Sequence, residues 1–128
     1  MSLIELVIAT GLLAVLLGLA VPGYQRQALR AQRAAIIERL IEAAHCQERI
    51  RSRTFHFDTT RCLPANIGRQ YRIRFEPENT VAATAFNVIA EPRGRQRADP
   101  CGSLSLHSTG NRSISGPDEL RRRCWAGR

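Results

Sequence analysis

The sequence predicts an α+β protein in which one long N-terminal helix lies on an antiparallel β-meander. Three observations lead to this prediction. The residues from Leu6 to Gln25 carry no formal charge. An amphipathic helical pattern follows them, and short alternating segments separated by turn residues come after it. The chain therefore divides into a hydrophobic stalk, residues 1–25, and a globular head, residues 26–128.

The stalk is long and apolar enough to cross a bilayer, since a spanning helix needs about 20 apolar residues. A cleaved secretory signal would need positive charge ahead of the apolar stretch, whereas Glu5 makes this N-terminus acidic. An ordinary single-pass anchor is the main alternative, yet it gains nothing from a carboxylate at its buried end. A buried ionised side chain is costly and by default functional, so Glu5 needs a cationic partner. The nearest cation is the α-amino group of the chain itself or of an identical neighbour.

The N-terminal residues resemble the mature N-terminus of a type IV pilin. The resemblance rests on Met1 to Ala9, which read MSLIELVIA, on the apolar stretch, and on Pro22-Gly23-Tyr24. Members of this family usually begin with Phe where this chain has Met. The segment around Cys101-Gly102-Ser103 and the terminal Cys124-Trp125 resemble the PilE-like branch, which includes minor pilins. The resemblance implies the type IV pilin fold.

The resemblance also implies processing and assembly. In this family a prepilin peptidase removes a short basic leader, so the chain would begin at its mature end with Met1 methylated. Glu5 would pair with the N-terminal amine of an adjacent subunit, because opposite charges attract strongly in a low-dielectric filament core. Pro22 would soften the helix between about Gly11 and Pro22. The expected partners are other pilin subunits, the pilus assembly machinery and the membrane. The chain would lie in the bacterial inner membrane before assembly and in an extracellular pilus, or fimbrium, afterwards.

The helix is predicted to continue into the head as an amphipathic segment over residues 26–51. Its apolar residues share one face, and its charged residues lie largely elsewhere. The apolar positions lack sustained heptads, which favours packing on a sheet over a coiled-coil seam. The apolar residues are Leu29, Ile36, Ile37, Leu40, Ile41 and Ala44, and the charged residues are Arg26, Arg30, Arg33, Arg39, Glu42 and Glu48.

A loop over residues 52–70 is expected to lead to a β-sheet over residues 71–115. Residues 71–75 and 83–90 alternate apolar and polar side chains, and turn residues lie between them. Two shorter strands, 103–107 and 112–115, follow and complete the predicted antiparallel meander.

Four cysteines are expected to stabilise the small head. They show neither CxxC spacing nor a histidine pair at zinc-finger distance, which argues against a metal site, and no cofactor is expected. A location outside the cytoplasm favours disulfides. Of three possible pairings, the sequence neighbours are favoured, Cys46 with Cys62 and Cys101 with Cys124. Each would contribute roughly 3 kcal/mol. The second resembles the disulfide-bounded C-terminal region of pilins, here residues 101–124.

The charge of the chain points to an anionic partner. Its net charge is +8, and all 19 basic residues are arginine, whose planar fork suits phosphates and carboxylates. Two arginine clusters are predicted to lie in loops near the second disulfide as candidate sites for DNA or another polyanion. Acidic polysaccharide would satisfy the same cations. The plainer alternative is that arginine usage reflects genome composition and the charges only solvate a surface. The clusters are Arg93, Arg95 and Arg97, and Arg121, Arg122, Arg123 and Arg128.

Trp125 could stack on a base, but a core position is favoured. Ser103, Ser105 and His107 would share one strand face with no acidic residue placed to orient the histidine, so we expect that the protein is not an enzyme.

The sequence predicts a structural pilus subunit that polymerises through its N-terminal helix and serves adhesion, twitching motility or DNA uptake. The alternative is a minor pilin or binding module that captures DNA, as in natural transformation, or another polyanion through its arginine-rich loops.

Overall fold

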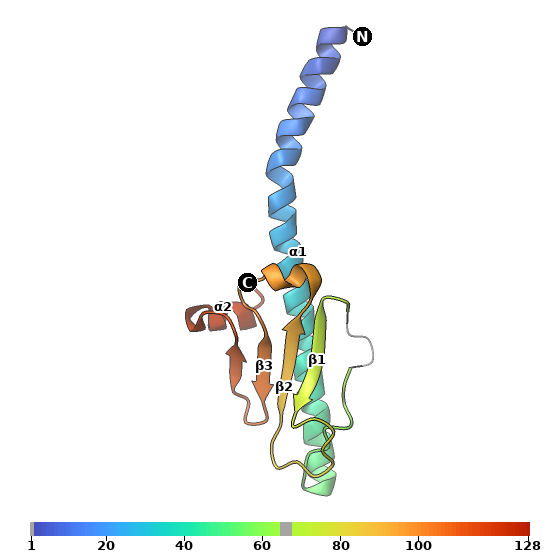
Figure 1. The fold of residues 1–128 in the computed structure, drawn as a ribbon, viewed down its shortest axis with the longest axis vertical. Coiled ribbons are helices and arrows are strands. Elements are labelled where there is room, and N and C mark those ends of the chain that lie inside the picture. The colour runs from blue at the N-terminus through green and yellow to red at the C-terminus, as the bar shows by residue number, and fades with distance from the viewer. Residues whose placement is uncertain (1, 65–67) are drawn as a thin grey trace.

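The computed structural model describes residues 2–64 and 68–128 and places one long helix against an antiparallel sheet (Figure 1). Helix α1 comes first, and three short helical segments flank the later strands. The helices are α1 (Leu3–Thr54), η1 (Gly94–Ala98), η2 (Asp118–Leu120) and α2 (Arg121–Trp125). The strands are β1 (Tyr71–Glu76), β2 (Asn87–Pro92), β3 (Leu104–His107) and β4 (Arg112–Ile114). The predicted fold class is confirmed.

The stalk half of α1 projects away from the head (Figure 1). Its apolar side chains are exposed, and by length and composition α1 could cross a membrane. The helix is continuous through Pro22, so the expected softening after Gly11 is not visible here as a break. Proline removes one backbone donor, and the carbonyl that loses its partner is that of Gly18, four residues earlier. A single lost hydrogen bond is compatible with an unbroken helix.

The core of the head lies between the second half of α1 and the sheet. Ile36, Ile37, Leu40 and Ala43 are buried on the helix face that packs on β2 and β3. This confirms packing on a sheet rather than a coiled-coil seam. The helix ends at Thr54, a few residues later than predicted, where the left-handed Phe55 donates its backbone N–H to the Arg51 carbonyl. The sheet contributes Tyr71, Ile73, Phe75, Val88, Ala90, Leu104 and Leu106.

The four strands follow one another in sequence order, and each pair is antiparallel. β1, β3 and β4 lie within a residue or so of their predicted bounds. The predicted strand 83–90 was wrong in its first half, because β2 begins at Asn87. In that first half, Ala83 makes an isolated bridge to Phe57, and the Phe86 ring packs edge-on against Phe57 at 4.9 Å between centroids. Side chains that enter the core from a loop are interspersed with exposed ones, and this pattern resembles the alternation of a strand.

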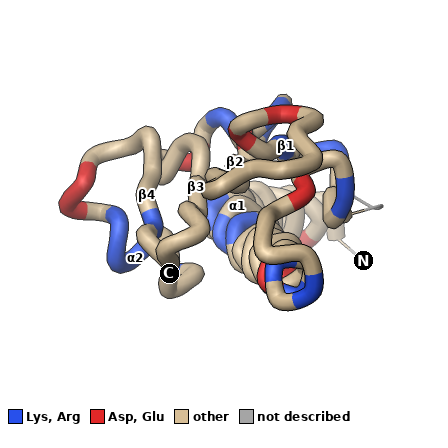
Figure 2. The backbone as a smooth tube through the Cα atoms, turned by 90° about the horizontal axis from the view of Figure 1, so that it is seen from below, with Lys and Arg blue, Asp and Glu red and all other residues tan. Residues whose placement is uncertain are grey.

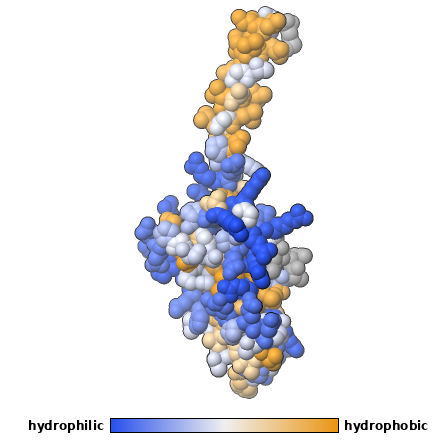
Figure 3. All heavy atoms as spheres, viewed as in Figure 1, coloured by the Kyte–Doolittle hydropathy of each residue, from blue (hydrophilic) through white to orange (hydrophobic). Residues whose placement is uncertain are grey.

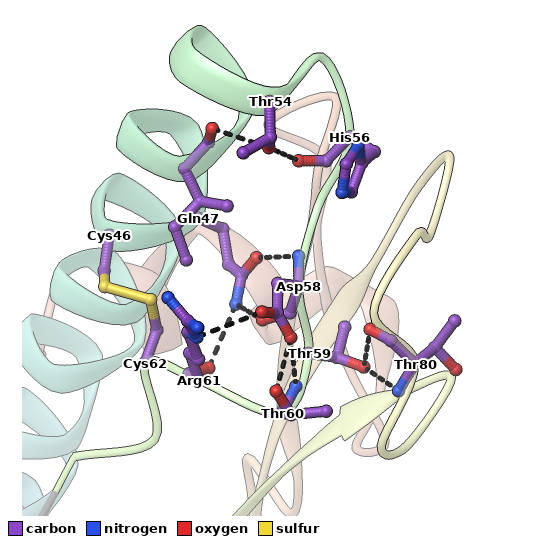
Figure 4. A network of polar contacts seen from close by, with 11 residues as sticks. Cys46, Gln47, Thr54, His56, Asp58, Thr59, Thr60, Arg61, Cys62 and Thr80 are labelled. Carbon is purple, nitrogen blue, oxygen red and sulfur yellow. Dashed lines mark hydrogen bonds and ion pairs between the residues drawn. A yellow bond between two sulfur atoms is a disulfide. The ribbon is translucent and has the colours of Figure 1, made fainter.

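The loop after α1 is held by one buried side chain and one disulfide (Figure 4). The Gln47 amide nitrogen donates to the main-chain oxygens of Asp58 at 2.7 Å and Arg61 at 3.1 Å. Its amide oxygen accepts from the Asp58 backbone N–H at 3.0 Å. Cys46 and Cys62 form a disulfide with their Cα atoms 5.8 Å apart. These contacts anchor the start of the predicted 52–70 loop, of which residues 65–67 lie outside the described part of the chain.

Candidate functional site

The two predicted arginine clusters lie on or next to η1 and α2, at the end of the head that faces the stalk (Figures 1 and 3). Figure 3 shows the most hydrophilic side chains gathered over this end. Arg93, Arg95 and Arg97 are exposed, as are the three arginines that open α2. The prediction that both clusters lie in loops was wrong for most of their residues, because Arg95 and Arg97 belong to η1 and the three arginines 121–123 belong to α2. Arg93 and Arg128 lie just outside these helical segments, as predicted.

A buried glutamine determines which way η1 presents its arginines. The Gln96 amide nitrogen lies 3.1 Å from the Leu29 carbonyl, 3.0 Å from the Tyr71 hydroxyl and 3.0 Å from an Asp99 carboxylate oxygen. Burial raises the pKa of Tyr71 to about 12, and the negative charge of Asp99 contributes, so this phenol stays neutral. With Gln96 turned inward, the flanking arginines of η1 point into solvent.

A buried ion pair joins α1 to the segment after η1. Arg33 Nη1 lies 2.6 Å from Asp99 Oδ1, and both side chains are almost fully buried. Arg33 Nη2 donates to the main-chain oxygen of Arg128 at 2.6 Å. Arg33 was predicted to lie with the other charged residues of α1, away from its apolar face. That placement was wrong because the acceptors that permit burial come from residues 66 and 95 positions further along the chain.

The second disulfide brings the C-terminal segment back to α1. Cys101 and Cys124 are bonded with their Cα atoms 5.9 Å apart, so both disulfides have the favoured pairing. Gly127 has φ +71°, and a Cβ at this position would lie 3.4 Å from the Ala34 side chain. Glycine therefore allows the chain to turn closely against α1, and Arg128 arrives beside the helix.

This return of the chain creates a depression of about 390 Å³, which we call the stalk-base pocket. Its cationic lining consists of Arg26, Arg30 and Arg33 from α1, Arg123 from α2, and Arg128. Arg26 and Arg30 were not among the predicted site residues. Their spacing of four and then three residues to Arg33 places all three on one helix face, and this signal could have identified them.

A second arginine group surrounds Trp125. The guanidinium carbon of Arg112 lies 5.3 Å from the centroid of the Trp125 ring, and Arg121 and Arg122 line the same shallow hollow. Trp125 is 8% exposed, and its indole N–H donates to the Ser113 carbonyl at 3.2 Å. The predicted core position of Trp125 is confirmed, and its ring is covered rather than open for base stacking.

Acidic residues next to these arginines are few in the described part of the chain. Asp99 is buried against Arg33, and Asp118 of η2 pairs with Arg121 at 2.9 Å. Figure 2 shows the acidic residues of η2 at one edge of the head, beside the basic α2. The charge of the stalk-facing end therefore remains strongly positive.

The other predicted site residues lie apart from this surface. Met1 is outside the described residues, Glu5 is exposed in the first turn of α1, and Pro22 is exposed within the helix. Ser105 and His107 point away from the core on β3. The Ser105 hydroxyl contacts that of Ser113, and His107 Nδ1 lies 2.9 Å from the Thr109 hydroxyl.

Comparisons with known proteins connect this architecture to pilins. Residues 22–105 match the model of a family described as type IV minor pilin ComP, DNA uptake sequence receptor. A type IV pilin structure from Shewanella oneidensis is similar, with a TM-score of 0.58 and 26% identity over 70% of this chain and 96% of that one. The non-core minor pilin PilV of Neisseria meningitidis has the same fold, with a TM-score of 0.55 and 19% identity over 71% and 90% of the two chains. No curated protein sequence matches this chain.

Proposed function

Because this chain belongs to the ComP family of type IV minor pilins, we propose that it is a pilus subunit that captures DNA. The observation that carries the proposal is the concentration of exposed arginines on η1 and around α2. We call this set the outer arginine surface. It comprises Arg93, Arg95, Arg97, Arg112, Arg121 and Arg122.

The chemistry of the outer arginine surface suits the phosphate backbone of DNA. Arginine offers several N–H donors in a rigid fork, and neutralised phosphates release counterions, which drives binding. Since Trp125 is covered, we expect phosphate contacts rather than base stacking to supply most of the affinity. The family description, a receptor for a DNA uptake sequence, supports the same ligand class. Acidic polysaccharide is the competing polyanion.

Replacing Arg93, Arg95 and Arg97 together with glutamine is expected to weaken binding of duplex DNA. The slope of log affinity against log salt should flatten by about 3, roughly 1 for each lost phosphate contact. Fluorescence anisotropy with a labelled duplex over a range of salt concentrations measures both quantities. The same series with acidic polysaccharide as competitor identifies the preferred polyanion.

A matched control removes the same charge from the far half of α1. Arg39, Arg49 and Arg53 are exposed there, and their replacement by glutamine should leave the salt slope close to wild type. An unchanged isotherm for the η1 variant would assign its arginines to solvation. Equal losses in both variants would mean that DNA responds to net charge rather than to this surface.

The exposed apolar side chains of the stalk must be buried against another apolar surface. Leu12, Leu16 and Leu19 are among the many stalk side chains that are more than half exposed in the isolated chain. Burial against a bilayer, and later against the helices of other pilin subunits, removes this surface from water. We therefore propose that the chain is held in the inner membrane before assembly and in an extracellular filament afterwards. In this role it acts without catalysis.

Glu5→Ala is expected to reduce incorporation into pili about tenfold or more, because it leaves the neighbouring N-terminal amine without its anionic partner. Immunoblots of sheared pili, normalised to the amount in the membrane fraction, measure this effect. Glu38→Ala removes an exposed carboxylate from the head and serves as the control. Incorporation of Glu5→Ala at the wild-type level would contradict the pairing.

A further inference from the structure

We propose that the stalk-base pocket binds the phosphate headgroup of an anionic phospholipid while the stalk lies in the membrane. The proposal rests on membrane insertion of the stalk, which is part of the proposed function, and not on DNA capture. It assigns a role to Arg26, Arg30, Arg33 and Arg123, which the outer arginine surface does not use.

The length of α1 places the pocket at the depth of lipid headgroups. Residues 3–25 extend about 34 Å at 1.5 Å per residue, and the hydrocarbon core of a bilayer is about 30 Å thick. Arg26 follows directly, and Arg30 lies one helical turn further on the same face. Both side chains are exposed, so their guanidinium groups are available to headgroup phosphates.

Among the charged side chains that line the pocket, hydrogen-bond donors outnumber acceptors. Its one acidic lining residue, Asp99, is already engaged by Arg33 at 2.6 Å and by the Cys101 backbone N–H at 3.0 Å. Arg33 Nε is buried and has no acceptor among the described residues. Arg123 of α2 also lines the pocket. A phosphate oxygen is the type of group that such a site lacks.

The shape and the apolar lining favour a lipid over a duplex. Leu29, Pro100 and Leu120 line the pocket together with the arginines, so one ligand would meet both charge and apolar surface. A phospholipid combines these properties at the boundary between headgroup and acyl chains. A volume of about 390 Å³ lies within the usual range for small-ligand sites, about 300–1,000 Å³. In the inserted state the pocket lies beside the bilayer surface, where anionic headgroups are concentrated.

The experiment uses the full chain in detergent micelles with added phosphatidylglycerol or phosphatidylcholine. Native mass spectrometry should show retained phosphatidylglycerol and little phosphatidylcholine. Each arginine near an anionic lipid surface strengthens binding by about fivefold, so Arg26→Gln with Arg30→Gln should weaken phosphatidylglycerol binding by about 25-fold. Arg49→Gln with Arg53→Gln, near the other end of α1, should bind as wild type. Equal retention of both lipids, or equal loss in both double variants, would overturn the proposal.

Two further probes separate the possible sources of phosphate. If inorganic phosphate displaces phosphatidylglycerol at equal concentration, the ligand is a free anion and the lipid assignment is wrong. If duplex DNA displaces the lipid and the Arg26 and Arg30 variant loses DNA binding to the same extent, the pocket belongs to the DNA surface and the proposal is also wrong. Retained lipid binding in the Arg93, Arg95 and Arg97 variant supports a separate site. This conclusion about the lipid site does not depend on the DNA proposal. It would stand even if the η1 variant bound DNA as tightly as wild type, a result that would contradict DNA capture by the outer arginine surface.

Discussion

Arg33→Ala is expected to destabilise the head by about 3–5 kcal/mol, because it leaves the Asp99 carboxylate buried without a cation. The side chains of the pair are 4% and 0% exposed, so water cannot replace the lost partner without rearrangement. The main-chain oxygen of Arg128 would lose its donor in the same substitution. Urea unfolding of the full chain in micelles, followed by the fluorescence of the single tryptophan, Trp125, measures the loss.

A double substitution tests whether the loss comes from the unpaired charge. Arg33→Met with Asp99→Leu removes both members of the pair and leaves apolar side chains, so it should cost far less than Arg33→Ala. If Arg33→Ala unfolds at the wild-type urea concentration, the ion pair contributes nothing and the C-terminal segment is held by other contacts. If both variants are equally unstable, packing volume rather than charge explains the effect.

Replacing Cys101 and Cys124 with alanine is expected to lower both the stability of the head and its affinity for DNA. The disulfide spans 23 residues, for which loop-closure entropy predicts about 3 kcal/mol of stabilisation. It also attaches α2, with Arg121 and Arg122, to the rest of the head. Without it the α2 arginines should sample many positions, and DNA binding would have to restore their order.

The other disulfide provides the control for this variant. Cys46 and Cys62 are separated by 16 residues, so their replacement should cost a similar amount of stability, about 3 kcal/mol. Because this disulfide anchors the loop after α1, its loss should leave the outer arginine surface intact. Urea unfolding and DNA anisotropy on both variants separate the two effects. Equal DNA affinities for the two variants would contradict a positioning role for the second disulfide.

Local patterns were sufficient to predict most elements of the fold. The uncharged stretch, the amphipathic helix and the alternation in β1 are each encoded within a few adjacent residues, so propensity and periodicity identify them. Residues 83–86 were wrongly predicted as strand because side chains that enter the core from a loop alternate with exposed ones, as those of a strand do. Trp125 was assigned correctly, since a large aromatic residue near a disulfide in a small head is most stable when buried.

The candidate site depended on contacts that no local pattern reveals. Arg33 is buried because Asp99 and the Arg128 main-chain oxygen come to it from distant parts of the chain. The stalk-base pocket exists because the C-terminal segment returns to α1. The arginine clusters themselves were found from sequence, but their division between an outer surface and a pocket required the three-dimensional path of the chain.

The continuity of α1 has a mechanical consequence. A pulling force on the stalk would travel along a single helix into the head, where the sheet resists it as shear rather than as peeling. The helix is attached to the head differently at its two ends, by the Arg33 and Asp99 ion pair near its entry and, towards its far end, by the Cys46 and Cys62 disulfide to the loop that follows it. Tension on the stalk would therefore act first on the ion pair. The disulfide would limit how far the helix could slide out of the head.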